Sequence, residues 1–496
     1  MTAMNGRPGP SGPGPPAGSN GPALQPEIRL TTEWVAGAMG GTARHGDPDR
    51  EFNGVSIDTR TLTAGELFFA IRGERFNGAD FAGAAIDAGA GGIVVERGRG
   101  SEFRSTAKEW PPFAVIEVDD AIAALQALAQ AVRRASGTKV VAITGSAGKT
   151  TTKEVTGEFL AARYRVVRNR GNFNNHIGLP LSLIELRRRP EIAVVELGMN
   201  HAGEISTLVR IAEPEVRVWT NVGEAHLGFF QSVDAIADAK SEICEGATPA
   251  TLLVANADDG RIAERISRFG GRVVTFGIDR GADVRATEVR SRGIDGTNAQ
   301  IATPRGAFEL TTPLIGRGNL ANVLAATAVA IEFDVPLATV MERAAHLTPA
   351  SHRGEVLRLS GGVTVIDDSY NANPTATKRA LEVLGETRDR SRRVAVLGEM
   401  LELGERASAL HEDVGRAAAE AKVDVVIAVG GAPARALADA AVAAGIGRAN
   451  VLYVATSDEA ADAAATLIRG GDLVLVKGSR GVRTDRVVDR LKAEFA

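Results

Sequence analysis

The sequence predicts an α/β protein with three domains: a small α/β domain, a central doubly wound parallel sheet of the P-loop type, and a Rossmann-like C-terminal α/β domain. Short β-branched apolar runs alternate with helical stretches along most of the chain. One of these runs feeds a glycine turn and then a Lys-Thr-Thr that opens a helix. The length of 496 residues suits about three domains of roughly 100–200 residues each.

The composition narrows the class of protein. With 44% hydrophobic and 24% charged residues the chain can build packed cores, and a net charge of −4 gives no reason to expect a nucleic-acid partner. Apolar runs stay below the roughly 18 residues of a membrane span, and no signal-peptide core is present. The only cysteine, Cys244, excludes an internal disulfide and is read as a packing residue. We therefore expect a cytoplasmic protein without membrane insertion.

Two breaks in the pattern divide the chain into domains. SGT follows a predicted helix, and LTPASHRG interrupts a later helical pattern. Before the first domain, Gly, Pro and Ser predominate, and such residues cannot bury enough surface to offset their ordering entropy. The predicted boundaries are a disordered tail at 1–26, the first domain at 27–136, the central domain at 137–348 and the C-terminal domain at 349–496.

Three polar-alternating segments near the end of the central domain predict an antiparallel appendage to its sheet. They lie near 284–290, 298–302 and 307–311.

The segment TKVVAITGSAGKTTTKE has the features of a phosphate-binding loop. Gly145 and Gly148 leave room for backbone N–H groups to face phosphate oxygens, and the N-terminus of the following helix adds partial positive charge. Lys149 can bridge the β- and γ-phosphates, and the hydroxyl of Thr150 or Thr151 can bind Mg²⁺. The pattern is a shortened G-x-x-G-K-T-T, and the alternative is an ordinary strand-to-helix turn. The loop itself is Gly145, Ser146, Ala147 and Gly148.

Two candidate residues follow strands of the same sheet and should lie at its carboxyl edge. Glu196 ends the strand IAVVEL and is a natural Mg²⁺ ligand, or else a helix cap or solvated acid. His226 follows the strand VRVWT and could bind a metal or a phosphate, although a loop histidine is more often a surface or capping residue.

Lys240 lies on the helix that follows this loop. An ammonium cannot ligate a cation, so a Lys240 that faces the site would bind phosphate or be carbamylated by CO₂, which burial favours. From its position alone, a solvent-facing helix lysine is the default interpretation.

Asparagines form two further groups. Asn174 and Asn175 belong to a polar glycine loop, either a turn or a ligand-facing loop. Asn319 and Asn322 are spaced i, i+3 on one predicted helix, where their amides could read a purine edge or could be a cap and a surface amide.

Motifs in all three domains resemble the Mur ligase family, ATP-dependent enzymes that form the amide bonds of the peptide stem of bacterial peptidoglycan. The match covers nearly everything after the tail. It includes SIDTR and GERFNGADF, then TGSAGKTTTKE, RGNFNNHIGLP, VVELGMNHAGEI, NVGEAHLGFF, ADAKSEI and GNLANVLAA, then IDDSYNANPTATKRAL, VLGEMLELG and VLVKGSRGVRTDRVV.

Within the family, DDSYNANP, LGEMLELG and RGNFNNHIGLP are similar to the ligase that joins D-Ala-D-Ala to UDP-MurNAc-tripeptide, and the DNPR motif of the preceding ligase is absent from the sequence. The resemblance implies ATP-dependent formation of UDP-MurNAc-pentapeptide through an acyl phosphate, by a protein that we expect to be a monomer. The alternatives are another Mur-type or folylpolyglutamate-type amide ligase, or, from a different class, a nucleotide-gated binding module.

The resemblance also implies roles for individual residues and for the cofactors ATP and two Mg²⁺ ions. Lys149, His226 and Lys240 would be catalytic, with Lys240 carbamylated, which reverses the default interpretation of that lysine. Thr150, Thr151, Glu196, His226 and the Lys240 carbamate would hold metal. Asn319, Asn322, Arg353 and Asp367, or its neighbour Asp368, would approach the nucleotide. Substrate would contact Ser56, Asp58 and Arg60 in a UDP-sugar-binding first domain, and also Asn174, Asn175, Asn371, Asn373, Lys477, Ser479 and Arg480.

Overall fold

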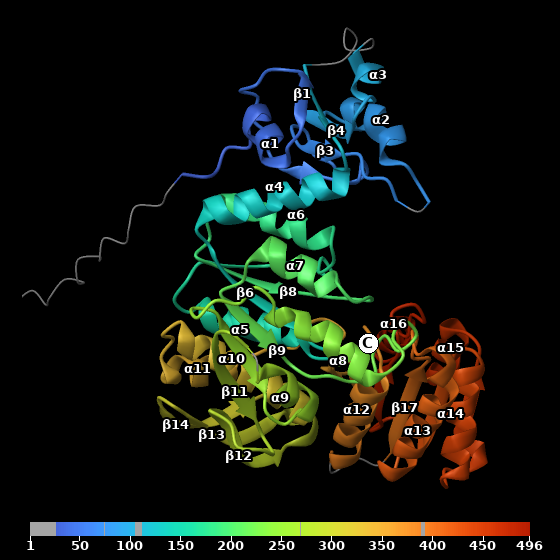
Figure 1. Ribbon diagram of the computed structural model, residues 1–496. Coiled ribbons are helices and arrows are strands. Elements are labelled where there is room, and N and C mark those ends of the chain that lie inside the picture. The colour runs from blue at the N-terminus through green and yellow to red at the C-terminus, as the bar shows by residue number, and fades with distance from the viewer. Residues whose placement is uncertain (1–25, 74, 105–111, 268, 388–391) are drawn as a thin grey trace, which may run out of the picture.

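A computed structural model describes residues 26–73, 75–104, 112–267, 269–387 and 392–496. It contains three α/β bodies, each built on its own sheet (Figure 1), which confirms the predicted fold class. The tail predicted at 1–26 lies outside the described residues except for Pro26.

The first body is a five-stranded sheet in the order β1-β5-β4-β3-β2, parallel except for β1. A long helix, α4 (Ala121–Ser136), leads from it to the central sheet, capped by the Asp120 side chain at its start and by Gly137 in the left-handed region at its end. The other elements are α1 (Thr32–Met39), β1 (Thr42–His45), β2 (Val55–Ser56), β3 (Leu67–Phe69), α2 (Ala82–Asp87), β4 (Gly92–Glu96), α3 (Gly100–Arg104) and β5 (Ala114–Val118).

The central sheet has nine strands in the order β14-β13-β12-β11-β10-β9-β6-β8-β7. Strand β6 lies between β8 and β9, so the strand order reverses at its carboxyl end, which is where ligands bind in open α/β sheets. The strands are β6 (Lys139–Thr144), β7 (Val166–Arg168), β8 (Ile192–Glu196), β9 (Val216–Trp219), β10 (Leu252–Asn256), β11 (Arg272–Gly277), β12 (Val284–Ser291), β13 (Thr297–Thr303) and β14 (Gly306–Thr312).

The predicted antiparallel appendage is present, with one refinement. β12 pairs antiparallel with β13 but parallel with β11, so it belongs to both parts of the sheet.

Helices cover both faces of the central sheet, so β6 is buried on both sides. Val140 and Ala142 pack in one core with α4, α6 and α7, whereas Val141 and Ile143 pack in another with α5 and α10. The helices are α5 (Lys149–Leu160), α6 (Gly178–Ile184), α7 (Glu204–Ala212), α8 (Val233–Ser241), α9 (Gly260–Ile266), α10 (Gly316–Glu332) and α11 (Leu337–Ala344).

The third body is a six-stranded sheet in the order β15-β16-β20-β17-β18-β19. Its five predicted strands are parallel, and the edge strand β15, which the sequence did not reveal, runs antiparallel to β16. The elements are β15 (Glu355–Arg358), β16 (Thr364–Asp368), α12 (Pro374–Glu386), β17 (Arg393–Gly398), α13 (Ala407–Glu420), β18 (Val425–Val429), α14 (Ala432–Ala443), β19 (Val451–Val454), α15 (Ser457–Leu467), β20 (Leu473–Lys477) and α16 (Asp485–Glu494).

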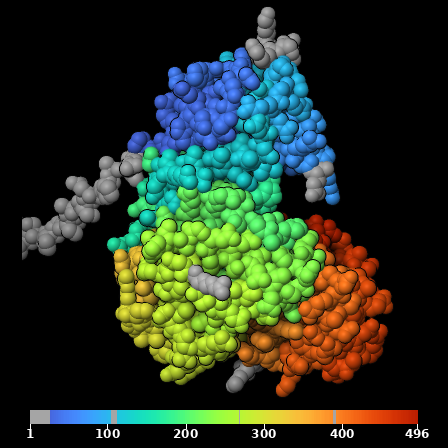
Figure 2. Space-filling model, in the orientation of Figure 1, coloured from blue at the N-terminus to red at the C-terminus, as the bar shows by residue number. Residues whose placement is uncertain are grey.

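The third body packs directly on the central one. Arg358 pairs with Asp295 across the boundary at 2.6 Å, and the backbone N–H of Gly228 donates to the carbonyl of Glu402 at 2.7 Å. Figure 2 shows an open recess between the first body, in blue, and the third, in orange and red. In the described part of the chain, no helix has both the length and the apolarity needed to cross a bilayer.

Candidate active site

The phosphate loop connects β6 to α5 and requires glycine at two positions. Gly145 has a φ of 150° and Gly148 a φ of 81°, which L-residues rarely adopt. A Cβ atom at Gly145 would lie 2.0 Å from Thr220 Oγ1, and one at Gly148 would lie 2.3 Å from Asn322 Oδ1. Neighbouring atoms therefore lie so close to Gly145 and Gly148 that neither position has room for a side chain.

Asn221 holds the middle of the loop, and the sequence prediction missed it. Its Oδ1 accepts from the Ala147 N–H at 2.9 Å, and its Nδ2 donates to the Ala147 carbonyl at 2.9 Å. The Thr220 hydroxyl donates to the same carbonyl at 2.8 Å. The available signal was position, because both residues directly follow β9 at the carboxyl edge of the sheet.

The carboxylate of Glu196 accepts hydrogen bonds from two side chains beside the phosphate loop. Thr150 Oγ1 donates to Glu196 Oε2 at 2.7 Å, and Asn174 Nδ2 donates to Glu196 Oε1 at 2.7 Å. The helix-cap alternative is wrong, because the next helix begins only at Glu204. Burial would raise the pKa of Glu196, but Lys149 and these hydrogen bonds, with Arg353, hold that pKa below its usual value. Glu196 is therefore a buried carboxylate beside the phosphate loop.

Lys149 lies at the start of α5 and is electrostatically coupled to Glu196. Its Nζ donates to the Gly145 carbonyl at 2.9 Å. Burial lowers the pKa of Lys149, Glu196 opposes that shift, and the positive charge of Arg353 adds to it. Arg353 comes from the third body, so the charge at the phosphate loop depends on both bodies.

Lys240 is buried in α8, and the solvent-facing interpretation is wrong. Its exposed fraction is 1%, and among the described residues its amine has no recorded hydrogen bond or ion pair. Burial holds the pKa of Lys240 well below its usual value, Lys149 acts in the same direction and Glu196 opposes them. Burial therefore shifts Lys240 toward its uncharged form.

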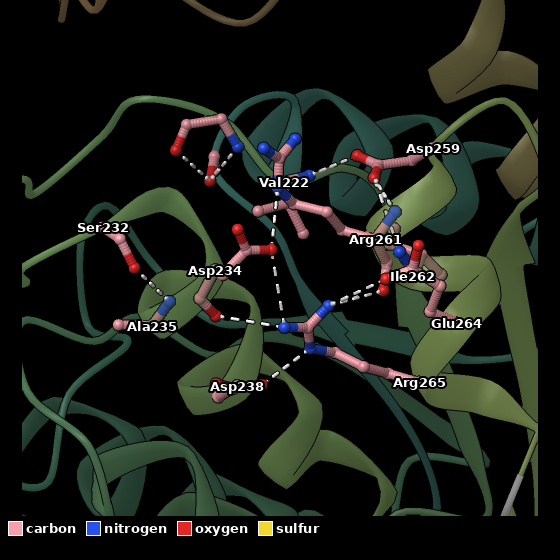
Figure 3. Close-up of polar contacts among 12 residues, drawn as sticks. Val222, Ser232, Asp234, Ala235, Asp238, Asp259, Arg261, Ile262, Glu264 and Arg265 are labelled. Atoms are coloured by element: carbon pink, nitrogen blue, oxygen red, sulfur yellow. Dashed lines mark hydrogen bonds and ion pairs between the residues drawn. The ribbon is translucent and has the colours of Figure 1, made fainter.

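Ion pairs between α8 and α9 fix the helix that carries Lys240. Figure 3 shows Arg265 reaching from α9 to α8, where its Nε lies 2.8 Å from Asp238 Oδ1. Arg261 Nε lies 3.1 Å from Asp234 Oδ1, and Arg265 also donates to the Asp234 carbonyl at 3.3 Å. These contacts join α8 to α9 on the solvent side of the helix that carries Lys240.

His226 has a φ of 64° and reaches the third body. Its Nδ1 lies 2.7 Å from Glu402 Oε2. Burial lowers the pKa of His226, the bond to Glu402 opposes that shift, and Lys149 and Lys240 add to it. The sequence missed Glu402, which lies 176 residues away in the LGEMLELG motif.

One cavity of about 680 Å³ unites the phosphate loop with the third body. It is lined by most of the predicted residues: Ser146, Ala147, Gly148, Lys149, Thr150, Thr151, Asn174, Asn175, Glu196, His226, Asn319, Asn322, Arg353, Asn371, Asn373 and Lys477. Eight predicted residues are not among those that line it: Gly145, Lys240, Asp367, Ser479, Arg480, Ser56, Asp58 and Arg60.

Of the two adjacent acids at the end of β16, Asp368 lines the cavity and Asp367 does not. Asp367 is fully buried, where it contacts His352 Nδ1 at 2.7 Å and accepts from the Ser369 hydroxyl at 2.6 Å. Asp368 lines the cavity and accepts from Lys477 Nζ at 2.6 Å. Consecutive strand residues point to opposite faces, so only one of the two can reach the cavity.

Ser479 and Arg480 lie beside the cavity wall rather than on it. The Ser479 hydroxyl accepts from the Leu401 N–H at 2.9 Å, which commits it to the fold of the domain. Arg480 donates to the Tyr370 hydroxyl at 3.2 Å, and Arg353 lies 4.2 Å from the centroid of the same ring. Tyr370 lines the cavity and was missed, although it lies within DDSYNANP.

The amides of α10 hold two helices together at the cavity. Asn322 accepts from Thr152 Oγ1 at 3.2 Å and donates to Asn319 Oδ1 at 3.2 Å, and Asn319 donates to the Ile315 carbonyl at 3.0 Å. The cap alternative is wrong, because Ile315 is the N-cap residue. The two side chains line the cavity while joining α10 to α5.

Ser56, Asp58 and Arg60 form a turn in the first body. Arg60 pairs with Asp58 at 2.6 Å, and this hydrogen bond lowers the pKa of Asp58 to about 2. The Arg60 side chain remains exposed.

The oxygens beside the phosphate loop suit Mg²⁺. Thr150 Oγ1 and the Glu196 carboxylate lie 2.7 Å apart, and Mg²⁺ is commonly bound by one or two protein oxygens together with phosphate and water. In the part of the chain that the structure describes, no three His, Cys, Asp or Glu side chains cluster as a metal cage.

The fold and the cavity define a multidomain phosphate-loop enzyme. Three family models match the chain: "Mur ligase family, catalytic domain" at residues 51–133, "Mur ligase middle domain" at 143–330 and "Mur ligase, glutamate ligase domain" at 352–480. The chain belongs to the Mur ligase family, as its motifs predicted.

Similar proteins agree with this assignment. The UDP-N-acetylmuramoyl-tripeptide–D-alanyl-D-alanine ligase of Bacillus subtilis (strain 168) is 33% identical over 94% of this chain and 98% of that protein. A crystal structure of MurF from Acinetobacter baumannii matches with a TM-score of 0.84 and 32% identity, covering 95% of this chain and 100% of the other. A MurF ligase structure from Thermotoga maritima in complex with ADP gives a TM-score of 0.77 and 29% identity over 89% of this chain and 97% of that one.

Proposed function

We propose that this enzyme joins D-Ala-D-Ala to UDP-MurNAc-tripeptide at the expense of ATP, giving the UDP-MurNAc-pentapeptide of peptidoglycan synthesis. The observation that carries the proposal is the single cavity in which the phosphate loop meets Arg353, Asp368 and Lys477 of the third body. The substrates are those that the name of the Bacillus subtilis relative states. Neither the folate-type alternative nor the nucleotide-gated module is favoured by these similarities.

The first chemical step activates the tripeptide. Its terminal carboxylate oxygen attacks the γ-phosphorus, the bond to the β-bridging oxygen breaks, and acyl phosphate and ADP result. Lys149 and the backbone N–H groups of the loop stabilise the charge that this transfer brings together. Arg353 adds positive charge from the opposite wall.

The second step forms the amide. The uncharged amine of D-Ala-D-Ala attacks the acyl carbon, a proton leaves the nitrogen, and the tetrahedral intermediate expels inorganic phosphate. Water would hydrolyse the acyl phosphate, so contact between the two bodies should precede the chemistry. The wall formed by Asn371, Asn373 and Lys477 is the surface we assign to the incoming dipeptide.

Mg²⁺ belongs to the proposal, held by Thr150, Thr151 and Glu196, with a second ion near His226. When bound, the ions would neutralise phosphate charge. Burial shifts Lys240 toward the uncharged amine, the form that attacks CO₂: a C–N bond forms, a proton leaves to solvent, and a carbamate anion remains.

The first body would bind the UDP-sugar part of the substrate through the turn at Ser56, Asp58 and Arg60. This end of the substrate would then lie in the first body while its peptide crosses the open recess to the cavity. We also propose that the enzyme acts in the cytoplasm as a monomer, which sedimentation of the purified protein would test.

The decisive experiment measures phosphate release from Mg·ATP with UDP-MurNAc-tripeptide, with and without D-Ala-D-Ala, alongside mass detection of the pentapeptide. Phosphate and pentapeptide that appear together only with the dipeptide support the proposal. Phosphate release that ignores the dipeptide and yields no pentapeptide contradicts it.

A further inference from the structure

Two loops from different bodies close on one another beside the cavity. Residues 226–228 follow β9, and residues 402–404 follow β17. We call the contact between these two segments the clasp. The N–H of Gly228 donates to the Glu402 carbonyl at 2.7 Å, and a Cβ atom at Gly404 would lie 3.1 Å from Gly228 Cα. A Cβ atom at either position would press against the facing backbone, and Gly404 also has a φ of 58°, which favours glycine.

The clasp brings together two side chains on strained backbone. His226 and Glu402 have φ values of 64° and 65°, in the left-handed region, which residues other than glycine uncommonly occupy, although histidine is enriched there. Such conformations persist where the surroundings over-determine them, and they concentrate at functional sites. Here they aim the imidazole and the carboxylate at each other, with 2.7 Å between Nδ1 and Oε2.

This hydrogen bond determines which ring nitrogen of His226 is free. A carboxylate only accepts hydrogen bonds, so in the neutral imidazole the proton lies on Nδ1 and the lone pair on Nε2. Among the described residues, Nε2 has no recorded hydrogen-bond partner, and His226 lines the cavity shared with the phosphate loop. A carboxylate behind a histidine is a common way of orienting a metal-binding imidazole.

We propose that Glu402 is a positioning residue: from the third body it holds His226 so that Nε2 faces the phosphate-loop cavity, and the site is therefore complete only when the third body is docked. This inference rests on the metal-binding role proposed for His226. The inference adds the Glu402 carboxylate to the site, so that docking of the third body on the central body also orients the His226 imidazole.

The test uses Glu402→Ala, the isosteric Glu402→Gln and a matched control, Glu405→Gln, at an exposed glutamate three residues further on. Mn²⁺ alone serves as the probe, titrated by electron paramagnetic resonance into full-length enzyme saturated with a non-hydrolysable ATP analogue. Steady-state kcat and the Mg²⁺ concentration for half-maximal rate are measured in parallel. Circular dichroism melts verify that each variant folds.

Removing the carboxylate should weaken Mn²⁺ binding and lower kcat about 10- to 100-fold, the usual cost of losing such a partner. Glu402→Gln should recover most of both values, because its amide oxygen can still accept from Nδ1, and Glu405→Gln should match wild type. In a His226→Ala background, Glu402→Ala should add no further loss.

Two results would overturn the inference: unchanged Mn²⁺ affinity in Glu402→Ala, or a full additional loss in the His226→Ala background, which would make the clasp a docking contact only. Failure of the proposed ligase reaction would appear separately, as wild-type enzyme that forms no pentapeptide while the Mn²⁺ titration still compares the variants.

Discussion

Replacing Lys240 by methionine should make the protein more stable and inactive. Methionine is close to lysine in length and volume, so the α8 core should accept it without a large cavity. It removes an amine that forms no hydrogen bond with the other described residues and that belongs to a side chain with an exposed fraction of only 1%. Leaving such a group unsatisfied costs about 1–3 kcal/mol. We expect the free energy of unfolding of the central body to rise by about that amount in CO₂-free buffer.

The gain should depend on pH in a defined direction. Because the folded-state pKa of Lys240 is depressed, the unfolded chain binds a proton that the folded chain does not, so wild-type stability rises with pH. The free-energy cost of burying the Lys240 amine is largest below its folded-state pKa and vanishes above the unfolded-state pKa of about 10.4. The Lys240→Met variant should lack this slope, so its advantage should shrink as the pH rises toward that value.

Differential scanning calorimetry of the central transition is the assay, with and without bicarbonate. For a body of this size, 1 kcal/mol corresponds to about 2–4 °C in Tm. Bicarbonate should raise the Tm of wild type, since the carbamate forms only on the folded-state amine, and should leave the variant unchanged. A variant less stable than wild type in CO₂-free buffer would refute the reasoning, because Lys240 would then have a stabilising partner.

Lys153 provides the matched control. It is equally buried, with an exposed fraction of 2%, but its Nζ donates to the Asn169 carbonyl at 2.7 Å and lies 3.1 Å from Glu154. Lys153→Met should therefore destabilise the protein by about 1–3 kcal/mol, because the buried carbonyl loses its donor. Opposite signs at two buried lysines would separate the effect of partners from the effect of burial.

Three further predictions concern the phosphate loop and the third body. Lys149→Ala should abolish ATP turnover with an unchanged melt; near-normal phosphate release would remove Lys149 from the proposed role. Gly145→Ala should lose nucleotide binding, measured by calorimetric titration, and cost about 2 kcal/mol or more in urea unfolding, because its Cβ would meet Thr220 Oγ1; wild-type binding would show that the loop tolerates a side chain. His411 is buried and accepts from the Met400 N–H at 2.9 Å, and burial lowers its pKa. Wild type should therefore lose stability as the pH falls below about 6.5, where the unfolded histidine is protonated, and His411→Gln should lose less. Urea unfolding from pH 7.5 to 5.5 measures this, and an equal loss of unfolding free energy in the two proteins would contradict it.

Local chemistry was readable from the sequence wherever one segment carries it. The strand, glycine turn and helix around Gly148 and Lys149 are consecutive, so their geometry follows from backbone sterics and the helix N-terminus. Glu196 was placed at the loop because parallel strands end at one edge of a sheet. The fold class followed from the alternation of apolar strand segments with helical segments, which is also a pattern of neighbours along the chain.

Which individual side chains reach the cavity depended on which face of each helix or strand packs against the core. Asp367 and Asp368 are adjacent in β16, and sequence alone could not say which one turns toward the cavity. Asn322 was expected to face the nucleotide, but its amide also bonds to Thr152 of α5, a contact across 170 residues of chain.

The sequence by itself determined the phosphate loop, the carboxyl-edge placement of Glu196 and His226, and the order of the α/β units, because each depends on neighbours along the chain. Only the tertiary structure decided that Lys240 is buried to an exposed fraction of 1% and that Glu402 reaches His226. Desolvation and contacts between bodies arise from packing over long sequence separations, so no local pattern encodes them.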